Sequence, residues 1–303
     1  MKKLLKFSCI IAFIFSSTLS IAQKNGNEIN HISSDFYELY KPDTTEVVLM
    51  LFGGYPENAE DIEREFAIND LANKKSIAVA YLNYSRKLWL EENEKRELAE
   101  SIQDLLISNN LPTKRIFFGG FSSGGNMALL ISDFLTGNSK YNIKPKGVFI
   151  VDSPLDLLEL YHTSEKNIKN NFSEDAVAES TWILETFNNK FGDPIENLKA
   201  YEKYSVSTLS TKNIKNINAL NETKLRFYTE PDTLWWKENK MADYEDLNAY
   251  HIKVLSENLQ QNGFKNSEYI PSKIKGHRSN GVRHPHSWSI VDKGELLKWM
   301  LEE

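Results

Sequence analysis

Two adjacent serines stand between two glycine pairs in the segment "RIFFGGFSSGGNMALLIS", residues 115–132. A serine hydroxyl becomes a nucleophile when a tight turn exposes it beside a base, and the pattern that does this is G-x-S-x-G between a strand and a helix. The chain turns so sharply there that side chains two positions before and after the serine would collide. Around Ser122 these positions are Gly120 and Gly124, whereas Ser123 has a phenylalanine at the first of them. The pattern therefore predicts Ser122 as a nucleophile.

The attack of a serine on a carbonyl group also requires hydrogen-bond donors for the negative oxygen that forms. Unsatisfied backbone N–H groups and the positive end of the helix dipole lie at the start of the helix that follows Ser122. We expect the N–H group of Ser123 to be one of these donors. The alternative interpretation is that the serines and glycines only form a structural turn.

With these residues in place, the chain resembles the α/β-hydrolase superfamily over nearly all of its length after the first 22 residues. In that family the order along the chain is serine, acid, histidine. The family takes a second oxyanion donor from a loop after an early strand, and "LFGGYPE" (51–57) is similar, although it lacks the histidine that often opens that loop. The resemblance implies Gly54 and Tyr55, from the stretch that begins at Gly53, as partners of Ser123 in the oxyanion hole.

The resemblance also places the acid after the strand that follows any cap, which is a group of helices inserted over one edge of the sheet. Here that strand is "LRFYT", and the sequence continues as "EPDTLWW" (230–236). Family members commonly show G-x-x-D at this point, and Asp232 lies three residues after Thr229, which takes the place of the glycine. Asp232 is thus the predicted acid and Glu230, nearer the strand end, is the alternative. Both residues could instead simply cap the next helix.

The loop "GHRSNGVRHPHSWSIVD" contains three of the six histidines. His286 stands next to the segment that leads into the final helix, which is the usual place of the family's histidine. We therefore predict His286 as the base, with His284 and then His277 as alternatives. The spacing of His284 and His286 also matches a metal-binding pair, but no third ligand occurs at a recognisable spacing, so no metal site is predicted.

Two further features of these segments could contact a substrate. Trp235 and Trp236 follow the predicted acid, and they could either line a substrate pocket or pack against the cap. Arg278 and Arg283 lie in the histidine loop, where they could hold an anionic part of a substrate or remain solvated.

Apolar runs predict the elements that position these residues. Continuous runs buried on both faces are typical of strands in a parallel sheet, and we expect strands at 46–54, 76–84, 115–120, 147–152 and 224–229, with a weaker one at 267–274. Helical composition or spacing predicts helices at 58–75, 91–110, 123–137, 248–263 and 293–303. This alternation predicts an α/β fold with a mostly parallel, doubly wound sheet.

The chain departs from a regular α/β repeat in two places. About 70 residues separate Asp152 from Lys224, which is too long for a simple crossover. We expect a helical cap at about 155–223, inserted before the strand that carries the acid. In addition, only a short stretch precedes the first strong strand, with room for one extra edge strand around "FYELY" (36–40).

Residues 1–22 have the pattern of a signal peptide, with a basic start, an apolar stretch and a small-x-small site ending at Ala22. The apolar stretch is shorter than the roughly 20 residues that a membrane anchor needs. We expect export to the periplasm or out of the cell, leaving residues 23–303 as a single domain without a membrane span. The only cysteine, Cys9, lies within the signal, so the mature chain would have no disulfide and no cysteine nucleophile.

The formal net charge is -6, and acidic and basic residues are interspersed, so the sequence has no basic stripe for nucleic acid. The resemblance implies an exported serine hydrolase that cleaves an ester through Ser122, Asp232 and His286 without a cofactor. A serine peptidase acting on short peptides is the alternative enzyme. An alternative of another class is an exported protein of the same fold that binds a ligand without catalysis.

Overall fold

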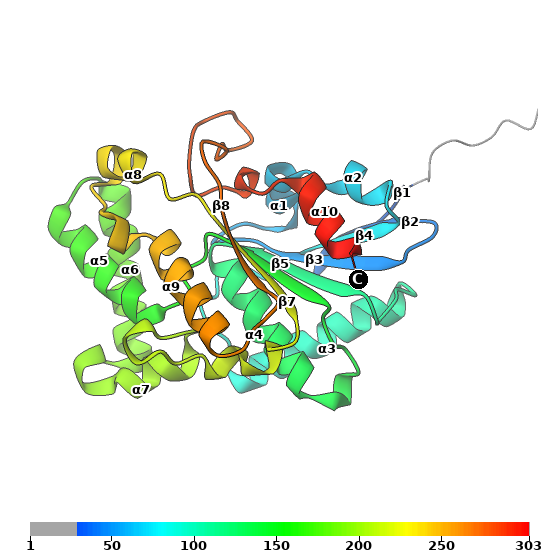
Figure 1. Ribbon diagram of the computed structural model, residues 1–303, viewed down its shortest axis with the longest axis horizontal. Helices are drawn as coiled ribbons and strands as arrows, with labels where there is room; N and C mark the ends of the chain where they lie inside the picture. The colour runs from blue at the N-terminus through cyan, green and yellow to red at the C-terminus, as the bar shows by residue number, and fades with distance from the viewer. Residues whose placement is uncertain (1–28, 303) are drawn as a thin grey trace, which may run out of the picture.

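The computed structural model describes residues 29–302, so the predicted signal peptide lies outside the described residues. Figure 1 shows a central sheet between layers of helices. Within residues 29–302 the sheet has eight strands, which are β1 (Ile29–Ser33), β2 (Tyr37–Pro42), β3 (Val47–Phe52), β4 (Ile77–Leu82), β5 (Ile116–Phe121), β6 (Gly147–Val151), β7 (Lys224–Thr229) and β8 (Ser267–Pro271). Their spatial order is β1-β2-β4-β3-β5-β6-β7-β8.

The strands from β3 onward run parallel to one another, and β2 joins β4 in antiparallel pairing. Every residue of β3, β4, β5 and β6 is buried, as continuous apolar runs predict for strands covered on both faces. The predicted α/β fold with a mostly parallel sheet is therefore confirmed. One edge strand was missed, because β1 is largely exposed and its sequence "INHIS" has no apolar run.

Helices cover both faces of the sheet (Figure 1). One layer contains α1 (Ala59–Phe66), α2 (Asn69–Asn73) and α10 (Lys293–Leu301), and the other contains α3 (Glu92–Ser108), α4 (Ser123–Gly137) and α9 (Asn248–Gln261). Successive side chains of a strand point to opposite faces. In β3, Leu49 and Leu51 accordingly pack with the first layer, whereas Val48 and Met50 pack with the second.

The connections contain the remaining helices. The helix predicted at 58–75 is divided into α1 and α2, because Ala67 adopts a left-handed conformation (φ 39°) that ends α1. Helix α8 (Thr233–Lys240) follows β7. Short 3-10 helices lie at Ser139–Tyr141, Leu209–Thr211, Lys215–Leu220, Tyr244–Asp246 and Trp288–Ile290.

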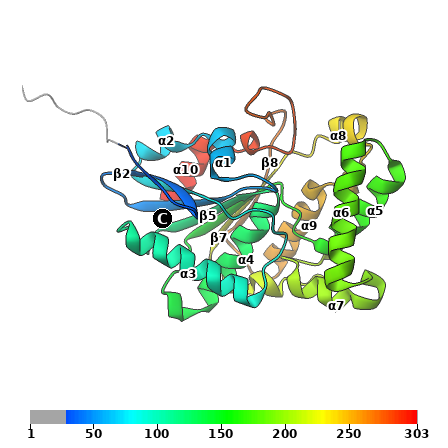
Figure 2. The same cartoon turned by 180° about the vertical axis from the view of Figure 1, so that it is seen from behind.

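A helical cap is inserted between β6 and β7, as predicted. It consists of α5 (Leu157–Asn170), α6 (Glu174–Phe191) and α7 (Pro194–Tyr204). The cap has its own apolar cluster, in which Leu157, Phe187 and Tyr201 are fully buried. Figures 1 and 2 show these helices beside one end of the sheet. No helix within residues 29–302 is both long enough and apolar enough to cross a membrane.

Candidate active site

Ser122 occupies a sharp turn between β5 and α4. Its backbone has φ 51° and ψ -129°, a region that is strained for a residue with a side chain. The turn is fixed on both sides, since the N–H of Ser122 donates to the carbonyl of Val151 (2.9 Å) and its carbonyl accepts from the N–H of Gly125 (3.0 Å). The surrounding structure thus holds Ser122 in a conformation that the chain would not adopt freely.

The glycines around Ser122 are required by close backbone approaches. A Cβ atom on Gly120 would lie 2.1 Å from the carbonyl oxygen of Gly124. A Cβ atom on Gly124 would lie 2.3 Å from the carbonyl oxygen of Phe52, at the end of β3. The steric reason for the G-x-S-x-G pattern is therefore confirmed, and the second glycine also lets the helix approach the neighbouring strand.

His286 forms a hydrogen bond with the carboxylate of Asp152. The distance from His286 Nδ1 to Asp152 Oδ2 is 2.6 Å. An ionised carboxylate only accepts hydrogen bonds, so Nδ1 is the donor, and in a neutral imidazole Nε2 is then the free acceptor. The His286 ring lies 4.4 Å, centroid to centroid, from the ring of Phe121, the residue before Ser122.

The sheet register places Asp152 beside Ser122. Phe121 and Val151 are paired at the ends of the parallel strands β5 and β6, so Ser122 and Asp152 are the next residues on adjacent strands. Asp152 has φ 48°, a left-handed conformation that aspartate tolerates better than most residues. Its N–H donates to the carbonyl of Tyr228 on β7 (2.9 Å), which fixes the turn.

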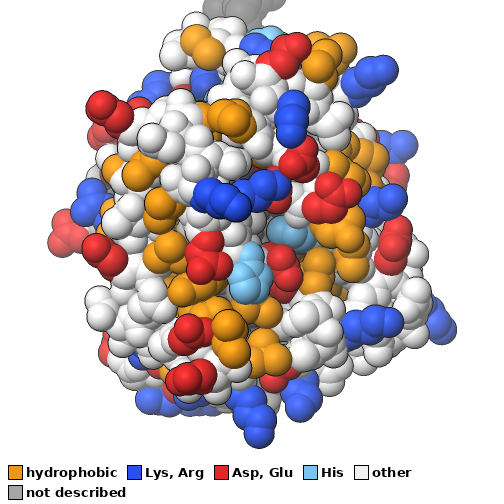
Figure 3. All heavy atoms as spheres, turned by 90° about the vertical axis from the view of Figure 1, so that its left-hand side faces the viewer, with side chains coloured by type: hydrophobic (Ala, Val, Ile, Leu, Met, Phe, Trp, Pro, Cys, Tyr) orange, Lys and Arg blue, Asp and Glu red, His pale blue; other side chains and the backbone are white. Residues whose placement is uncertain are grey.

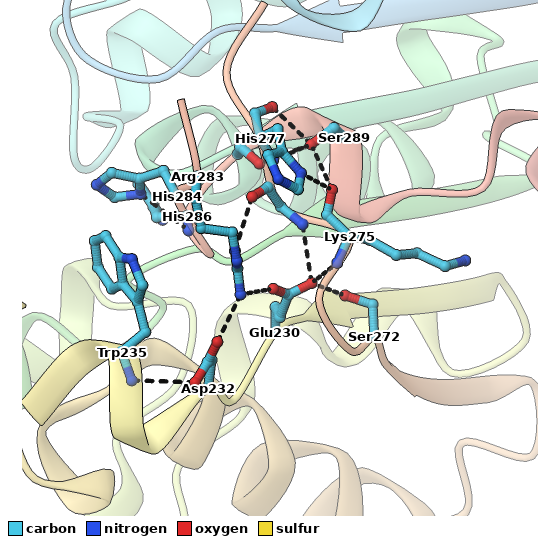
Figure 4. Close-up of polar contacts among 12 residues, drawn as sticks. Glu230, Asp232, Trp235, Ser272, Lys275, His277, Arg283, His284, His286 and Ser289 are labelled. Atoms are coloured by element: carbon cyan, nitrogen blue, oxygen red, sulfur yellow. Dashed lines mark hydrogen bonds and ion pairs between the residues drawn. The ribbon is translucent and has the colours of Figure 1, made fainter. Parts of the chain in front are cut away.

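The structure does not bring Asp232, the predicted acid, to His286. Its Oδ1 accepts from the N–H of Trp235 (3.1 Å) and caps α8, and its Oδ2 lies 2.6 Å from the guanidinium of Arg283 (Figure 4). The simpler interpretation of Asp232 as a helix cap describes its contacts. Asp152 takes the position beside the histidine that the sequence analysis had assigned to Asp232.

Glu230, the alternative acid, is buried at the end of β7 and supports the histidine loop instead. Its Oε2 accepts from Ser272 Oγ (2.8 Å) and from the N–H groups of Lys275 (2.8 Å) and Gly276 (3.1 Å). Its other oxygen forms an ion pair with Arg283. Figure 4 shows Arg283 between Glu230 and Asp232. Both carboxylates that follow β7 are thus engaged by Arg283.

The two alternative histidines have other surroundings. His284 Nδ1 accepts from the N–H of His286 (3.2 Å), and its ring lies 4.8 Å from that of Trp235. Burial lowers the pKa of His284 to about 3, which keeps it neutral near pH 7. His277 is exposed. Among the described residues, no group of three or more His, Cys, Asp or Glu could hold a metal ion.

The loop after β3 lies against Ser122, but one of its predicted donors is occupied. A Cβ atom on Gly54 would be 3.0 Å from Ser122 Cβ. The N–H of Gly54 donates to Glu57 Oε2 (2.9 Å), and Trp288 Nε1 donates to the same oxygen (3.2 Å). Burial raises the pKa of Glu57, and these two donors partly oppose the rise. Gly54 therefore supports the loop through Glu57.

The other two predicted oxyanion donors remain available. Ser123 is the first residue of α4, where N–H groups have no partner within the helix. Within residues 29–302, neither the N–H of Ser123 nor that of Tyr55 donates to a protein acceptor. Ser123 directly follows Ser122 in the chain, and Tyr55 directly follows Gly54, which lies against Ser122.

Comparisons with known proteins identify the fold. A scan against protein-family models finds no match, and a search of curated proteins finds none. Solved structures do match. They include a mutant of the esterase rPPE (TM-score 0.57, 13% identity, covering 92% of this chain and 84% of that chain) and a putative esterase from Staphylococcus aureus (TM-score 0.54, 13% identity, 91% and 84%). A carboxyl esterase from the fungus Tuber melanosporum also matches (TM-score 0.52, 13% identity, 91% and 85%).

The chain has the α/β-hydrolase fold. In this fold the cap touches the loop after β3, since the rings of Trp182 on α6 and Tyr55 stack at 5.1 Å. Lys166 on α5 lies 3.1 Å from Asp243 and 2.5 Å from Asp246, which follow α8. Aromatic and ionic contacts thus join the cap to the rest of the fold.

The predicted aromatic pair lies beside the histidines of the hydrolase fold. Trp235 and Trp236 are partly exposed and meet edge to face at 5.3 Å, and both rings contact His284. Figure 3 shows this side of the molecule, with histidine side chains near its centre among acidic and apolar ones and with Lys and Arg side chains nearby. These tryptophans therefore border the loop that carries His284 and His286.

Sequence reasoning missed two residues of this candidate site. Asp152 ends the run "GVFIVD", and a charged residue directly after a strand buried on both faces was a usable signal. Glu57 follows the glycine-rich loop and is partly buried, but it has no sequence pattern that separates it from the other acidic residues nearby.

Proposed function

We propose that this chain is a serine hydrolase that cleaves carboxylic esters, with Ser122 as nucleophile, His286 as base and Asp152 as acid. The observation that carries the proposal is the 2.6 Å contact between His286 and Asp152, made by a ring that packs against the residue before Ser122. Ser122, in its strained conformation, and Asp152 lie in adjacent turns. Together with the imidazole of His286 they are the components of nucleophilic acyl transfer.

In the proposed reaction His286 accepts protons at Nε2, because its Nδ1 donates to Asp152. Ser122 Oγ attacks the ester carbonyl carbon as its proton passes to His286 Nε2, and Asp152 stabilises the imidazolium that forms. The tetrahedral intermediate collapses, the bond to the alcohol breaks, and the alcohol takes the proton from His286. Water then attacks the acyl-enzyme, again giving a proton to His286. The carboxylic acid leaves, and Ser122 recovers its hydroxyl hydrogen.

The proposed oxyanion donors are the N–H groups of Ser123 and Tyr55. Both are free of protein acceptors in the described part of the chain. The Ser123 group also lies at the amino end of the 15-residue helix α4, where the helix dipole favours negative charge. Gly54 contributes by holding the loop against Ser122.

Ester hydrolysis is preferred to peptide hydrolysis because the similar structures named above are esterases, which is an argument by analogy. An aryl acetate and a short aminoacyl anilide, assayed side by side, separate the two activities. Faster turnover of the aryl acetate supports the ester proposal. Turnover of the anilide alone would replace it with a peptidase.

Covalent labelling tests the site itself. The protein is treated with a fluorophosphonate and the adduct is located by peptide mass mapping, with His286→Ala in parallel and Ser123→Ala as the matched control. We expect an adduct on Ser122 in the parent and in Ser123→Ala, and a much slower reaction in His286→Ala. Absence of an adduct on the folded parent would favour a ligand-binding protein without catalysis.

We also propose that the chain is exported and that the signal peptide at 1–22 is removed. The supporting observation is the sequence pattern alone, because these residues lie outside the described range. Fractionation of the expressing cells, followed by N-terminal sequencing of the recovered protein, tests this. A mature N-terminus just after Ala22 in the periplasm or the medium is expected, and an intact chain in the cytoplasm would contradict it.

A further inference from the structure

Arg278 lies on the same aromatic ring that contacts the proposed base. Its guanidinium carbon is 5.5 Å from the centroid of Phe121, and the His286 ring is 4.4 Å from that centroid. A guanidinium over an aromatic face is held by the quadrupole of the ring. Arg278 therefore places a positive charge on the ring that His286 also contacts, in the residue directly before Ser122.

The backbone around Arg278 is fixed by contacts that do not use its side chain. The N–H of Arg278 donates to the carbonyl of Val282, and its carbonyl accepts from the N–H of Gly281, both at 2.9 Å. The next residue, Ser279, donates to Glu65 on α1 through its N–H (2.9 Å) and its hydroxyl (2.6 Å). These contacts fix the backbone from which the Arg278 side chain extends to the Phe121 ring.

The charge of Arg278 has no ionic partner within residues 29–302. Arg283, five positions later, has its charge matched by Glu230 and Asp232, whereas no ion pair or hydrogen bond involves the Arg278 guanidinium. Glu57 is near enough for its pKa to be affected by Arg278, but the Glu57 Oε2 already accepts from Gly54 and Trp288. Arg278 thus keeps its donors free for another molecule.

We propose that Arg278 binds a carboxylate of the substrate, so that the preferred esters carry a carboxylate besides the ester group that is cleaved. This inference rests on the proposed function. A single guanidinium supplies one positive charge and two parallel donors, which matches a carboxylate monoanion in number of charges and in shape. The carboxylate would orient the ester carbonyl relative to Ser122.

Pairs of substrates that differ only in charge test the proposal. On the leaving-group side the pair is 3-acetoxybenzoate and its neutral amide, 3-acetoxybenzamide. On the acyl side it is the 4-nitrophenyl monoester of adipate and the 4-nitrophenyl ester of adipic monoamide. Whichever side faces Arg278, we expect a higher kcat/KM for the anionic member of that pair, by about 10- to 100-fold for one charged hydrogen-bonded contact.

Three variants separate recognition from general electrostatics. Arg278→Met should remove the preference for the anion and leave the neutral substrate nearly unchanged, whereas Arg278→Lys should keep part of it. Arg64→Met is the matched control, because Arg64 is an exposed arginine on α1 paired with Asp61 and Glu65. Added salt should weaken the preference in the parent and have no such effect in Arg278→Met.

Two results would overturn the proposal. The first is equal kcat/KM within both pairs in the parent. The second is an equal loss for neutral and anionic substrates in Arg278→Met, which would make Arg278 a distant counter-charge for Glu57. Circular dichroism and urea unfolding confirm that each variant is folded.

A binding measurement keeps this test independent of turnover. In Ser122→Ala, calorimetric titration with 3-acetoxybenzoate and the adipate monoester should show tighter binding of one of them than of its neutral partner. That difference should vanish in Ser122→Ala/Arg278→Met, and binding without discrimination would contradict the proposal. If the parent lacks esterase activity and fluorophosphonate labelling, the proposed function fails, while this titration still decides whether Arg278 binds a carboxylate.

Discussion

Asp152 and His286 are separated by 134 positions in the chain, yet Asp152 Oδ2 lies 2.6 Å from His286 Nδ1. The pairing arises because β6 and β7 are adjacent parallel strands, so a loop above their carboxyl ends could reach an acid on either one. After β7, Arg283 engages both Glu230 and Asp232. The histidine therefore pairs with the carboxylate that remains, at the end of β6.

Replacement of Asp152 by asparagine tests this assignment. The amide side chain would hold the ring but would favour the wrong tautomer and could not stabilise the imidazolium, so kcat for an aryl acetate should fall by about 10³- to 10⁴-fold. Asp232→Asn is the matched control and should lower kcat far less, because Asp232 does not contact His286. Similar losses in the two variants would contradict the assignment.

The sequence was sufficient to predict the strands that are completely buried. Strands such as β3 and β5 were predicted because each is a continuous apolar run. The turn at Ser122 was predicted because Gly120 and Gly124 have steric roles that local geometry imposes. The exposed strand β1 was missed because pairing with β2, and not its own composition, makes it a strand.

The partner of the histidine could not be predicted in the same way. The order serine, acid, histidine is satisfied equally by Asp152, Glu230 and Asp232. What distinguishes them is the position of the Arg283 guanidinium, which depends on how the loop folds over β7. A long-range ion pair of this kind has no local sequence pattern, so the choice among carboxylates required the structure.

Arg283→Met should destabilise the fold. The Glu230 side chain is 1% exposed and that of Arg283 is 23% exposed, so removal of the guanidinium leaves a buried carboxylate without its counter-charge. The free energy of unfolding, measured with urea, should fall by about 2–4 kcal/mol. Arg64→Met removes the ion pairs with Asp61 and Glu65, but the Arg64 side chain is 58% exposed, so the change should cost less than about 1 kcal/mol.

A second substitution shows whether the uncompensated charge is the cause. In Arg283→Met/Glu230→Gln the buried group is neutral, so part of the lost stability should return. If no stability returns, the loop is stabilised by the shape of Arg283 and by its hydrogen bond to the carbonyl of Gly276 (2.7 Å), and not by its charge.

The backbone at Ser122 should be more stable with glycine than with alanine. At φ 51° a Cβ atom is strained, and glycine removes that strain. Ser122→Gly and Ser122→Ala should both abolish labelling by a fluorophosphonate, but Ser122→Gly should have the higher free energy of unfolding, by about 1 kcal/mol. Equal stability of the two variants would show that the turn is relaxed.

The stability of the protein should depend on pH through Asp156, the N-cap of α5. Its carboxylate accepts from the N–H groups of Leu158 (2.9 Å) and Leu209 (2.7 Å), but it is only 2% exposed, and burial raises its pKa to about 6. The pH window runs from about 4, the ordinary pKa of this carboxyl group, to about 6, its pKa in the folded chain. Within this window the unfolded chain has lost the proton that the folded chain retains. The folded state then binds more protons, so the free energy of unfolding falls as pH rises through this window and levels off above it.

Asp156→Asn should remove this contribution, since the amide does not titrate. The free energy of unfolding is measured with urea at intervals from pH 4 to pH 8. Over this range the parent should lose about 2–3 kcal/mol of stability relative to the variant. The reason is that a pKa difference of one between the folded and unfolded chains corresponds to about 1.4 kcal/mol. Asp193→Asn is the control, because Asp193 caps α7 with an exposed carboxylate and should show no such change. Parallel curves for the parent and Asp156→Asn would mean that the N–H donors of Leu158 and Leu209 fully offset the burial of this carboxylate.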